Sequence, residues 1–467
     1  MKVLAFDFGA SSGRAILGTC DRNRLQLDEI HRFPNDAVSI NGRMYWDVLR
    51  LFREMKTALA KCAAMGHKDI ASIGIDTWGV DYGLLDKEGC LISNPRHYRD
   101  SRTRGAIERL DNRLAREQMF FETGIQPMEI NTAYQLASEQ MSENADKLLF
   151  MPDLLGYFLT GEKRCEKTIL STSQLFNINS CVLSKTVLDT IGIEQSLLCP
   201  IVEPGTVLGT LTREISLETG LPQIPIVSIA GHDTASAVAA IPFSGNDKAI
   251  FLSCGTWSLL GAELPKPVIT KEAFNAGFTN EIGVAGTVRF LKNIVGLWIV
   301  QQCREKWKRD GQDVSFVQLN EEAANAQISS YINPNDAAFI APPDMPAAIA
   351  QYCKARGQAT PETRGEFIAC VLQSLAKEYC HGVEQLESVL GFEADVLHMA
   401  GGGVQNELLC QLTANATGKT VIAGPVEATA AGNILVQMIA LGMIKDIAYG
   451  REIVRNSFEF QVYKNNT

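Results

Sequence analysis

Asp233 is the carboxylate whose neighbours best suit proton transfer. It follows an apolar stretch at 224–229 that predicts a buried strand, and it precedes a small-residue stretch at 235–240 that predicts a helix. An Asp at this position can simply cap the helix. The polar groups of His232 and Thr234 favour a second interpretation, in which Asp233 accepts the proton of a hydroxyl that attacks a phosphoryl group. A carboxylate of ordinary pKa is sufficient for that task.

A turn near the N-terminus has the composition of a phosphate-binding site. Phosphate needs backbone N–H donors at close approach, which glycine and small hydroxyl residues provide, and a guanidinium adds charge. The residues that offer these groups are Ala10, Ser11, Ser12, Gly13 and Arg14. Asp7 precedes the turn at the end of a predicted strand and could hold Mg²⁺, which takes one or two carboxylates when it bridges phosphates. A plain hairpin turn is the alternative.

Two further glycine-containing turns lie in the second half of the chain. The run 253–258 (SCGTWS) repeats the chemistry of the first turn, with Gly255 aligned to Gly9, and predicts two related domains that each supply a phosphate turn. Gly402 lies in a triple-glycine run between a predicted strand at 396–399 and a predicted helix at 407–414, where a nucleotide could approach bare backbone. A tight structural turn is the alternative. Neither the dinucleotide fingerprint nor the P-loop motif occurs.

A cluster of acids and one indole at 76–81 suits a sugar. Sugars present hydroxyl groups along one edge and C–H groups on a face, so carboxylates, the Thr77 hydroxyl and the Trp78 ring could bind one. A buried Trp with solvated acids is the alternative.

Strands predicted at 3–6, 14–17 and 70–75, together with a helix at 46–65, indicate an α/β architecture. A chain of 467 residues is too long for one core and predicts two or three domains. The breaker cluster at 242–247 places the boundary between residues 244 and 245, so we expect domains at 1–244 and 245–467.

Composition limits the partners and the compartment. The net charge of −10 and the pI near 5.3 argue against nucleic acid and membrane partners, since both need a basic face. Asp7 interrupts the N-terminal apolar run, and no apolar stretch approaches the ~20 residues of a membrane span. We therefore expect a cytoplasmic protein. The 12 cysteines are scattered without metal-site spacing, so we expect reduced thiols.

Taken in order, the motifs of this chain resemble those of the FGGY carbohydrate kinases of the actin-like superfamily. The resemblance covers nearly the whole sequence and is carried by 7–14 (DFGASSGR), 74–81 (GIDTWGVD), 98–103 (YRDSRT), 151–153 (MPD), 231–238 (GHDTASAV), 253–260 (SCGTWSLL), 291–298 (LKNIVGLW) and 401–406 (GGGVQN). Single motifs are weak, whereas the ordered set is specific. It implies an α/β fold of two related actin-like (RNase H-like) domains with an active-site cleft between them.

The resemblance also implies an activity: MgATP-dependent phosphorylation of the 1-hydroxyl of L-rhamnulose. The partners would be a small ketose and MgATP, and the protein a monomer or small homo-oligomer. Asp233 would be the proton acceptor, and the ketose site would be lined by Gly79, His232, Asp233 and Thr234. The ATP contacts would be Ala10, Ser11, Ser12, Gly13, Arg14, Thr256, Asn293, Gln301 and Gly402. Asn293 is expected to open the helix that contains Gln301.

Two alternatives stay open. The first is a kinase for another ketose, such as L-fuculose or D-xylulose, because sequence reads stereochemistry poorly. The second is an actin-like ATPase or sugar-responsive regulator, since the fold alone does not determine the function. Asp233 as a candidate base argues against the second. Residues 305–360 match no motif.

Overall fold

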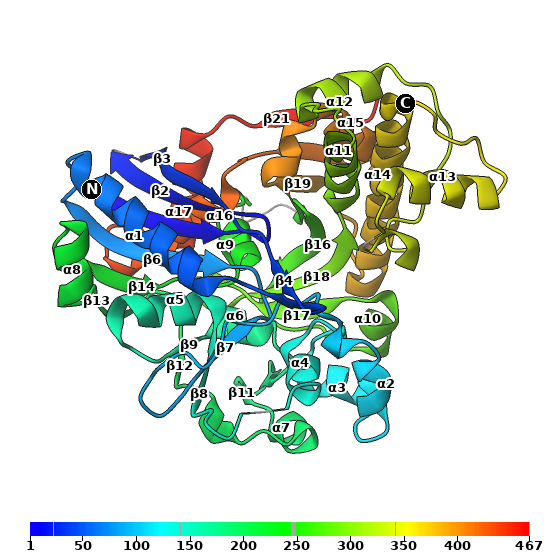
Figure 1. Cartoon of the computed structure of the whole chain (residues 1–467). Helices are drawn as coiled ribbons and strands as arrows, with labels where there is room; N and C mark the ends of the chain where they lie inside the picture. The colour runs from blue at the N-terminus through cyan, green and yellow to red at the C-terminus, as the bar shows by residue number, and fades with distance from the viewer. Residues whose placement is uncertain (22, 141, 244–248, 341, 467) are drawn as a thin grey trace. The chain divides into compact units, whose positions relative to one another are not determined.

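The computed structural model describes residues 1–21, 23–140, 142–243, 249–340 and 342–466, which form two compact units (Figure 1). The chain enters each unit three times. Unit 1 contains Met1–Pro242, Glu263–Phe290 and Ala428–Ser457, and unit 2 contains Phe243–Ala262, Leu291–Glu427 and Phe458–Thr467. The boundary expected between 244 and 245 lies outside the described residues.

Unit 1 is built on a six-stranded sheet of order β13-β14-β6-β1-β2-β3. Its strands are β1 (Lys2–Phe8), β2 (Ser12–Asp21), β3 (Arg24–Pro34), β6 (Ile70–Thr77), β13 (Thr206–Thr210) and β14 (Pro225–Ser228). Strand β1 pairs antiparallel with β2 and parallel with β6, and β6 pairs parallel with β14. Because parallel strands end at the same edge of a sheet, the residues that follow β1, β6 and β14 are brought together there.

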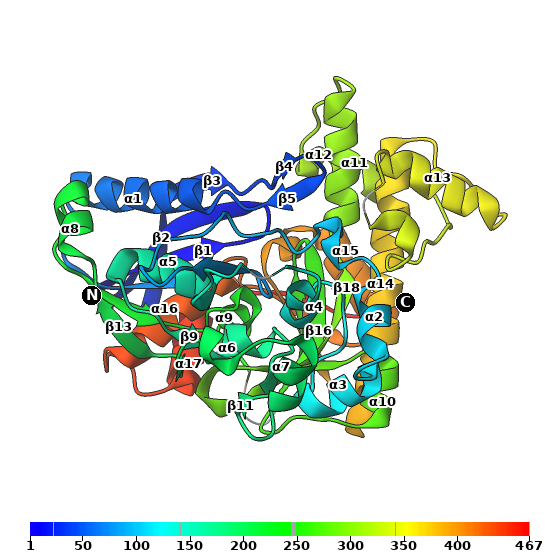
Figure 2. The ribbon, with the colours of Figure 1, turned by 60° about the horizontal axis from the view of Figure 1, so that its bottom comes forward.

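Helices cover both faces of this sheet. Figure 2 shows α1 (Val48–Ala64) on one face of β1, β2 and β3, with α9 (Asp233–Ala239), α16 (Ala428–Ala440) and α17 (Ile447–Ser457) on the other. The predicted helix at 46–65 is confirmed as α1, which buries the apolar stripe Val48, Leu51, Met55, Ala58, Leu59 and Cys62. Helices α9 and α16 cross so closely that a side chain at Gly432 would meet the Ser236 carbonyl oxygen at 1.7 Å.

The rest of unit 1 consists of shorter elements. Its other helices are α2 (Ala106–Asp111), α3 (Arg116–Thr123), α4 (Thr132–Ala137), α5 (Met151–Thr160), α6 (Lys167–Ser171), α7 (Lys185–Ile191), α8 (Arg213–Thr219) and α10 (Lys271–Ala276). Its other strands are β4 (Val38–Ile40), β5 (Arg43–Tyr45), β7 (Tyr82–Leu85), β8 (Lys147–Phe150), β9 (Cys165–Glu166), β10 (Phe176–Asn177), β11 (Val182–Leu183), β12 (Ile201–Val202) and β17 (Thr279–Ile282). Short 3₁₀ turns lie at Ser101–Thr103, Gln195–Leu197 and Val284–Gly286.

The second sheet has the strand order β17-β18-β16-β15-β19-β20-β21, and most of it belongs to unit 2; β17 and residues 288–290 of β18 belong to unit 1. Its strands besides β17 are β15 (Ala249–Cys254), β16 (Trp257–Leu264), β18 (Val288–Val295), β19 (Val396–Ala400), β20 (Thr420–Ala423) and β21 (Gln461–Tyr463). The helices are α11 (Trp298–Arg309), α12 (Phe316–Ala324), α13 (Met345–Ala355), α14 (Arg364–Leu390) and α15 (Glu407–Thr417), with 3₁₀ turns at Ala337–Phe339 and Gly402–Gln405.

The two sheets share one pairing scheme, which confirms the predicted pair of related domains. In the second sheet, β15 pairs antiparallel with β16 and parallel with β19, and β19 pairs parallel with β20. In the first sheet, β1 pairs in the same way with β2 and β6, and β6 pairs parallel with β14. The connection between the antiparallel strands differs by one residue: residues 9–11 join β1 to β2, whereas 255–256 join β15 to β16.

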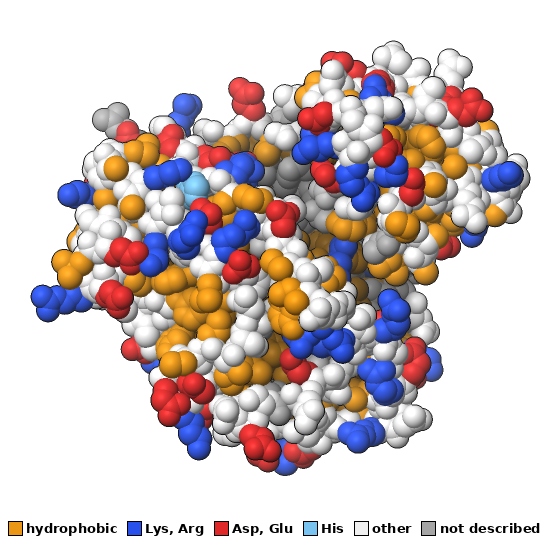
Figure 3. Space-filling view, in the orientation of Figure 1, with side chains coloured by type: hydrophobic (Ala, Val, Ile, Leu, Met, Phe, Trp, Pro, Cys, Tyr) orange, Lys and Arg blue, Asp and Glu red, His pale blue; other side chains and the backbone are white. Residues whose placement is uncertain are grey.

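The surface charge, the helix composition and the state of the cysteines complete the description of the fold. Figure 3 shows acidic and basic side chains interspersed over the face in view. In the part of the chain that the structure describes, no helix combines the length and the apolar composition that crossing a bilayer requires. All 12 cysteines are free thiols.

Candidate active site

Three carboxylates gather at the edge of the unit 1 sheet where the parallel strands end. Asp7 and Asp76 are register partners on β1 and β6, so their side chains lie on the same face. Asp233 begins α9, and a bridge between Thr77 and His232 aligns the residues before it with the end of β6. Asp7 and Asp76 are only 5% and 0% exposed, whereas the side chain of Asp233 is 28% exposed.

Burial and mutual repulsion set the electrostatics of this group. Burial, and then the charge of Asp7, raise the pKa of Asp76 well above its ordinary value, although Asn433 Nδ2 donates to its Oδ2 at 2.6 Å. Burial also raises the pKa of Asp233; His232 opposes this effect and Asp7 adds to it. A carboxylate with a raised pKa is a stronger proton acceptor. The carboxylate interpreted as a base is therefore placed where its basicity increases.

The predicted phosphate turn joins β1 to β2. The Gly9 N–H donates to the Ser12 carbonyl at 2.9 Å, and Asn35 closes the turn by donating its amide Nδ2 to the Gly9 carbonyl at 2.8 Å. Ser11 is exposed, Ala10, Ser12 and Arg14 are partly buried, and Gly13 is buried. Arg14 Nη2 donates to Asp7 Oδ2 at 2.5 Å, from the position directly across the strand pair. A side chain at Gly13 would meet the Phe33 ring at 2.3 Å, so this glycine is required for packing.

Gly79 and His232 converge, as the sugar-site expectation requires. A side chain at Gly79 would lie 3.2 Å from Thr172 Oγ1 and 3.3 Å from His232 Nε2. Val80, which follows, has φ 65°, a strained conformation for a β-branched residue. It is held by a 3.2 Å hydrogen bond from its N–H to Thr172 Oγ1. The Thr77 hydroxyl donates to the Trp78 carbonyl at 2.8 Å.

Trp78 belongs to a buried aromatic cluster organised by Asp81. Oδ2 of Asp81 accepts hydrogen bonds from Trp46 Nε1 at 2.6 Å, from Trp78 Nε1 at 3.0 Å and from the Tyr98 N–H at 3.1 Å. Burial raises the pKa of Asp81 to about 6, against the effect of these donors. The alternative of solvated acids is wrong, because Asp76 and Asp81 are both fully buried. Contact of Trp78 with a sugar stays a prediction.

In unit 2, the side chains of Thr256 and Gln301 are in contact. Asn293 is not part of the helix that contains Gln301. The Thr256 hydroxyl is 3.4 Å from Gln301 Oε1, and the Trp298 N–H donates to the Thr256 carbonyl at 3.2 Å. Helix α11 therefore starts directly beside the second turn. Asn293 lies in strand β18, so the expectation that it opens this helix is wrong. The helix begins only after Gly296, where a side chain would meet Ser258 Oγ at 2.6 Å.

The three glycines at 401–403 have different reasons to be glycine. Gly401 adopts φ 87°, and a side chain at Gly403 would meet Cys254 Sγ at 2.2 Å. A side chain at Gly402 would meet nothing within 4 Å. Backbone conformation explains Gly401, and packing explains Gly403. The space beside the third, Gly402, is open, and its contact with a nucleotide stays a prediction.

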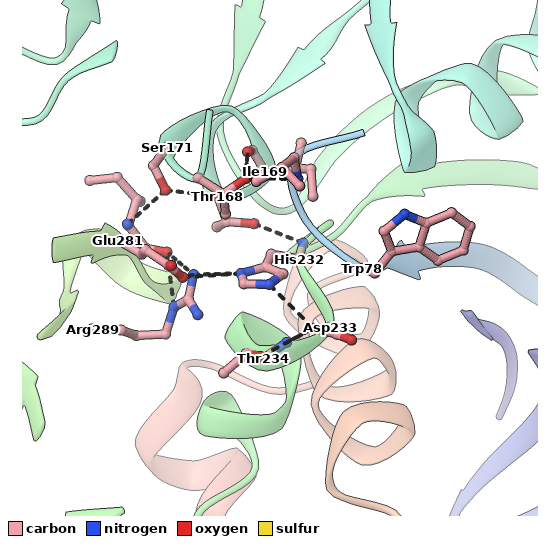
Figure 4. Close-up of polar contacts among 12 residues, drawn as sticks. Trp78, Thr168, Ile169, Ser171, His232, Asp233, Thr234, Glu281 and Arg289 are labelled. Atoms are coloured by element: carbon pink, nitrogen blue, oxygen red, sulfur yellow. Dashed lines mark hydrogen bonds and ion pairs between the residues drawn. The ribbon is translucent and has the colours of Figure 1, made fainter. Parts of the chain in front are cut away.

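Sequence analysis missed three buried charged residues near His232 and Asp233: Glu166, Glu281 and Arg289, the last two of which are labelled in Figure 4. Glu166 accepts hydrogen bonds from the Gly231 N–H at 2.9 Å and from Thr168 Oγ1 at 2.6 Å, which fixes the backbone before His232. Glu281 lies 3.2 Å from His232 Nδ1, and Arg289 Nη2 lies 3.0 Å from Glu281. A charged residue inside the apolar stretch 288–291 was the available signal, since a buried cation requires a buried partner.

Comparison with known proteins defines the family to which this chain belongs. Residues 2–240 match the N-terminal domain, and residues 250–441 the C-terminal domain, of the FGGY family of carbohydrate kinases. The chain belongs to this family and is a phosphotransferase that uses ATP and a small-molecule sugar.

Individual relatives give a more specific comparison than the family does. The chain is 44% identical to the rhamnulokinase of Bacteroides thetaiotaomicron over 98% of its own length and 95% of that protein. It is 40% identical to the rhamnulokinase of Bacillus subtilis, over 98% and 94%. Among solved structures, the xylulose kinase of Lactobacillus acidophilus superposes with a TM-score of 0.79 at 15% identity, covering 100% of this chain and 94% of that one. The glycerol kinase of Plasmodium falciparum gives the same values. These structures confirm the fold.

The environment of His97 predicts a pH dependence of stability. His97 stacks on Trp46 with ring centroids 4.1 Å apart, and burial, followed by Arg99 and Arg102, lowers the pKa of His97 to about 3 from 6.5. Between pH 6.5 and about 3 the unfolded chain binds a proton at this position that the folded chain does not, so the free energy of unfolding falls as pH falls. His97→Asn should reduce that slope by up to about 1.4 kcal/mol per pH unit in urea unfolding.

His381→Asn, which removes an exposed imidazole on α14, is the matched control for the loss of one histidine. Equal slopes for His97→Asn and the unmodified protein between pH 6 and 4 would contradict a buried neutral imidazole.

Proposed function

We propose that this protein is a rhamnulokinase, which transfers the γ-phosphoryl group of ATP to the 1-hydroxyl of L-rhamnulose and yields L-rhamnulose 1-phosphate and ADP. The observation that carries this proposal is 37–44% identity to seven rhamnulokinases over nearly the full length of both partners. Kinases for xylulose and gluconate share the fold at only 12–18% identity.

Asp233 is the base in this reaction. As the sugar hydroxyl oxygen forms its bond to the γ-phosphorus, the bond from that phosphorus to the β–γ bridging oxygen breaks and ADP leaves. The hydroxyl proton passes to the Asp233 carboxylate. The 28% exposure of this side chain leaves it accessible, and its raised pKa suits proton acceptance. In a loose transition state the hydroxyl loses its proton late, so the position of the Asp233 carboxylate matters more than its basicity.

Asp7 would hold Mg²⁺ together with the phosphates of ATP. Its surroundings fit a hard cation, because the neighbouring Asp76 and Asp233 are oxygen donors that add negative charge, and one oxygen of Asp76 is buried without a hydrogen-bond partner. Because Mg²⁺ at a phosphate site usually keeps several waters and takes one or two carboxylates, Asp7 would need few protein partners. When bound, the cation neutralises charge that develops on the phosphates.

Ligand contacts are assigned to the remaining predicted residues. Thr77, Trp78, Gly79, His232 and Thr234 would contact the ketose. The turn at 10–14 would contact phosphate, and Thr256, Asn293, Gln301 and Gly402 would contact the nucleotide. The close approach of Gly79 to His232, the 3.4 Å pair of Thr256 and Gln301, and the open space at Gly402 support these assignments.

The substrate is tested by measuring ADP release coupled to NADH oxidation with MgATP and L-rhamnulose, L-fuculose, D-xylulose, L-ribulose or glycerol. We expect kcat/KM for L-rhamnulose to exceed the others at least tenfold, a difference of about 1.4 kcal/mol in transition-state binding. A higher kcat/KM for another ketose would reassign the substrate within the family. Equal ADP release without sugar would support an ATPase instead.

The base is tested by Asp233→Asn, which keeps the shape of the side chain and removes its ability to accept a proton. We expect kcat to fall by about 10²-fold or more, with the Kd for ATP changed little. Asp189→Asn, at an exposed position on α7, is the control and should retain full kcat. Near-normal turnover in Asp233→Asn would remove this residue from the mechanism.

The nucleotide contact is tested by Gly402→Leu. Because the added side chain has free space in the protein, it should obstruct only a ligand and raise the KM for ATP about tenfold, equivalent to about 1.4 kcal/mol, while the KM for the sugar stays within about twofold. Gly403→Ala should instead lower the melting temperature through its clash with Cys254. Equal increases in both KM values for Gly402→Leu would indicate a structural role.

A further inference from the structure

Arg289 is a fully buried cation that has no role in the proposed reaction. It lies on β18 with 0% exposure, and its Nε and Nη2 donate to the Ile282 carbonyl at 3.2 and 3.1 Å. Its Nη2 is 3.0 Å from Glu281 Oε2. Burying a guanidinium is costly unless an anion compensates it, and removing one partner of such a pair typically costs several kcal/mol. A buried pair of this kind directly behind the candidate base suggests a role beyond packing.

His232 lies between this pair and Asp233. Its Nδ1 is 3.2 Å from Arg289 Nη2, in hydrogen-bonding geometry, and 3.2 Å from Glu281 Oε2. On the opposite side of the ring, Nε2 is 3.3 Å from Asp233 Oδ1. Figure 4 shows the ring between Arg289 and Asp233, with a contact drawn from each of its nitrogens. The imidazole therefore connects the buried ion pair to the base.

The contacts of Nδ1 decide which ring nitrogen carries the proton. A guanidinium nitrogen can only donate a hydrogen bond, so the Arg289 contact favours an unprotonated Nδ1 that accepts this bond. Among the described residues, Glu281 Oε2 has no partner in hydrogen-bonding geometry, although it lies close to both cationic groups. Glu281 therefore compensates the charge of Arg289 without requiring a proton on Nδ1. The neutral ring then carries its proton on Nε2, facing Asp233.

A proton on Nε2 distinguishes the two oxygens of Asp233. Oδ1 accepts hydrogen bonds from the Thr234 N–H at 2.6 Å and from Thr234 Oγ1 at 3.1 Å, and it faces the Nε2–H of His232. The structure shows no comparable donor for Oδ2 within the described residues. Two hydrogen bonds from Thr234 and the nearby Nε2 of His232 all lie at Oδ1, which leaves Oδ2 as the oxygen with free lone pairs.

We propose that Arg289 and Glu281 are positioning residues of the kinase: Arg289 holds His232 as the Nε2–H tautomer, and His232 with Thr234 occupies Oδ1 of Asp233, so that Oδ2 alone receives the sugar proton. The inference rests on the proposed function, because it takes Asp233 as the base. It adds two buried residues, Glu281 on β17 and Arg289 on β18, that act on Asp233 through His232. The competing arrangement, with the proton on Nδ1 and directed at Glu281, would leave Oδ1 without the His232 donor.

The tautomer can be measured directly in the full-length protein. Long-range ¹H–¹⁵N correlation spectra of protein labelled with ¹⁵N-histidine distinguish a protonated ring nitrogen from an unprotonated one, and the signals missing in His232→Asn assign the residue. At neutral pH we expect an unprotonated Nδ1 and a protonated Nε2. A protonated Nδ1, alone or together with Nε2, overturns the proposal. This measurement needs only the unmodified protein and the assignment variant, so it decides the question even if Arg289 variants fail to fold.

Kinetics test the consequence for catalysis. Arg289→Met should lower kcat by about 10- to 100-fold, the loss typical of a displaced catalytic group, with the KM for ATP within about twofold. Arg289→Lys, which keeps a charged donor, should recover part of kcat. Arg451→Met is the matched control: Arg451 is also a largely buried arginine of unit 1, and it pairs with Glu263 at 2.8 Å but not with His232. It should lower stability and leave kcat unchanged.

Failure of this inference and failure of the proposed function give different results. If Asp233→Asn turns over normally, Asp233 is not the base, and the proposed mechanism falls whatever the tautomer of His232. If Asp233→Asn is inactive while Arg289→Met retains the kcat of the unmodified protein, the base stands and the positioning role of Arg289 is overturned.

Discussion

The parallel register of β1 and β6 is the constraint on which the site of unit 1 depends. It places Asp7 beside Asp76 at the same edge of the sheet, and the start of α9 adds Asp233 to the same electrostatic neighbourhood. Carboxylates removed from water repel one another and lose hydration, and each effect disfavours the charged form. The fold must therefore provide each carboxylate with donors or countercharges, and the surrounding structure can be understood as the set of groups that do so.

Each acid has its own partners, and these come from distant parts of the chain. Arg14 on β2 pairs with Asp7, and Asn433 on α16 donates to Asp76. Behind Asn433, a buried hydrogen-bond chain continues through Gln437 to Ser72 on β6. Every member of that chain is fully buried, so α16 can dock in only one register without leaving a polar group unsatisfied. The tight crossing at Gly432 adds a steric requirement for the same placement.

Short sequence patterns were sufficient to predict those elements whose structure depends on neighbouring residues alone. The two glycine-containing turns, the strands that flank them and helix α1 follow from apolar periodicity and turn chemistry within short segments. Asn293 shows where the inference failed: residues 291–295 extend an apolar strand, and the helix assigned there starts only beyond Gly296. Glu281 and Arg289 could not be connected to His232 from sequence, because the pairing joins β17, β18 and the start of α9 across long stretches of chain. The burial of Asp76 and Asp81 also depends on such non-local packing.

The threefold entry of the chain into unit 1 has a consequence for biosynthesis. The ribosome makes the first 242 residues, which contain β1 and β6, before α16 exists, and residues 428–457 follow only after most of unit 2 has been made. At translation speeds of about 5–20 residues per second, that delay is on the order of tens of seconds, far longer than the collapse of a small domain. During this interval the nascent chain exposes an apolar surface bearing Ser72 and Asp76 without their partners. The packing of unit 1 is therefore completed only after α16 and α17 have been made.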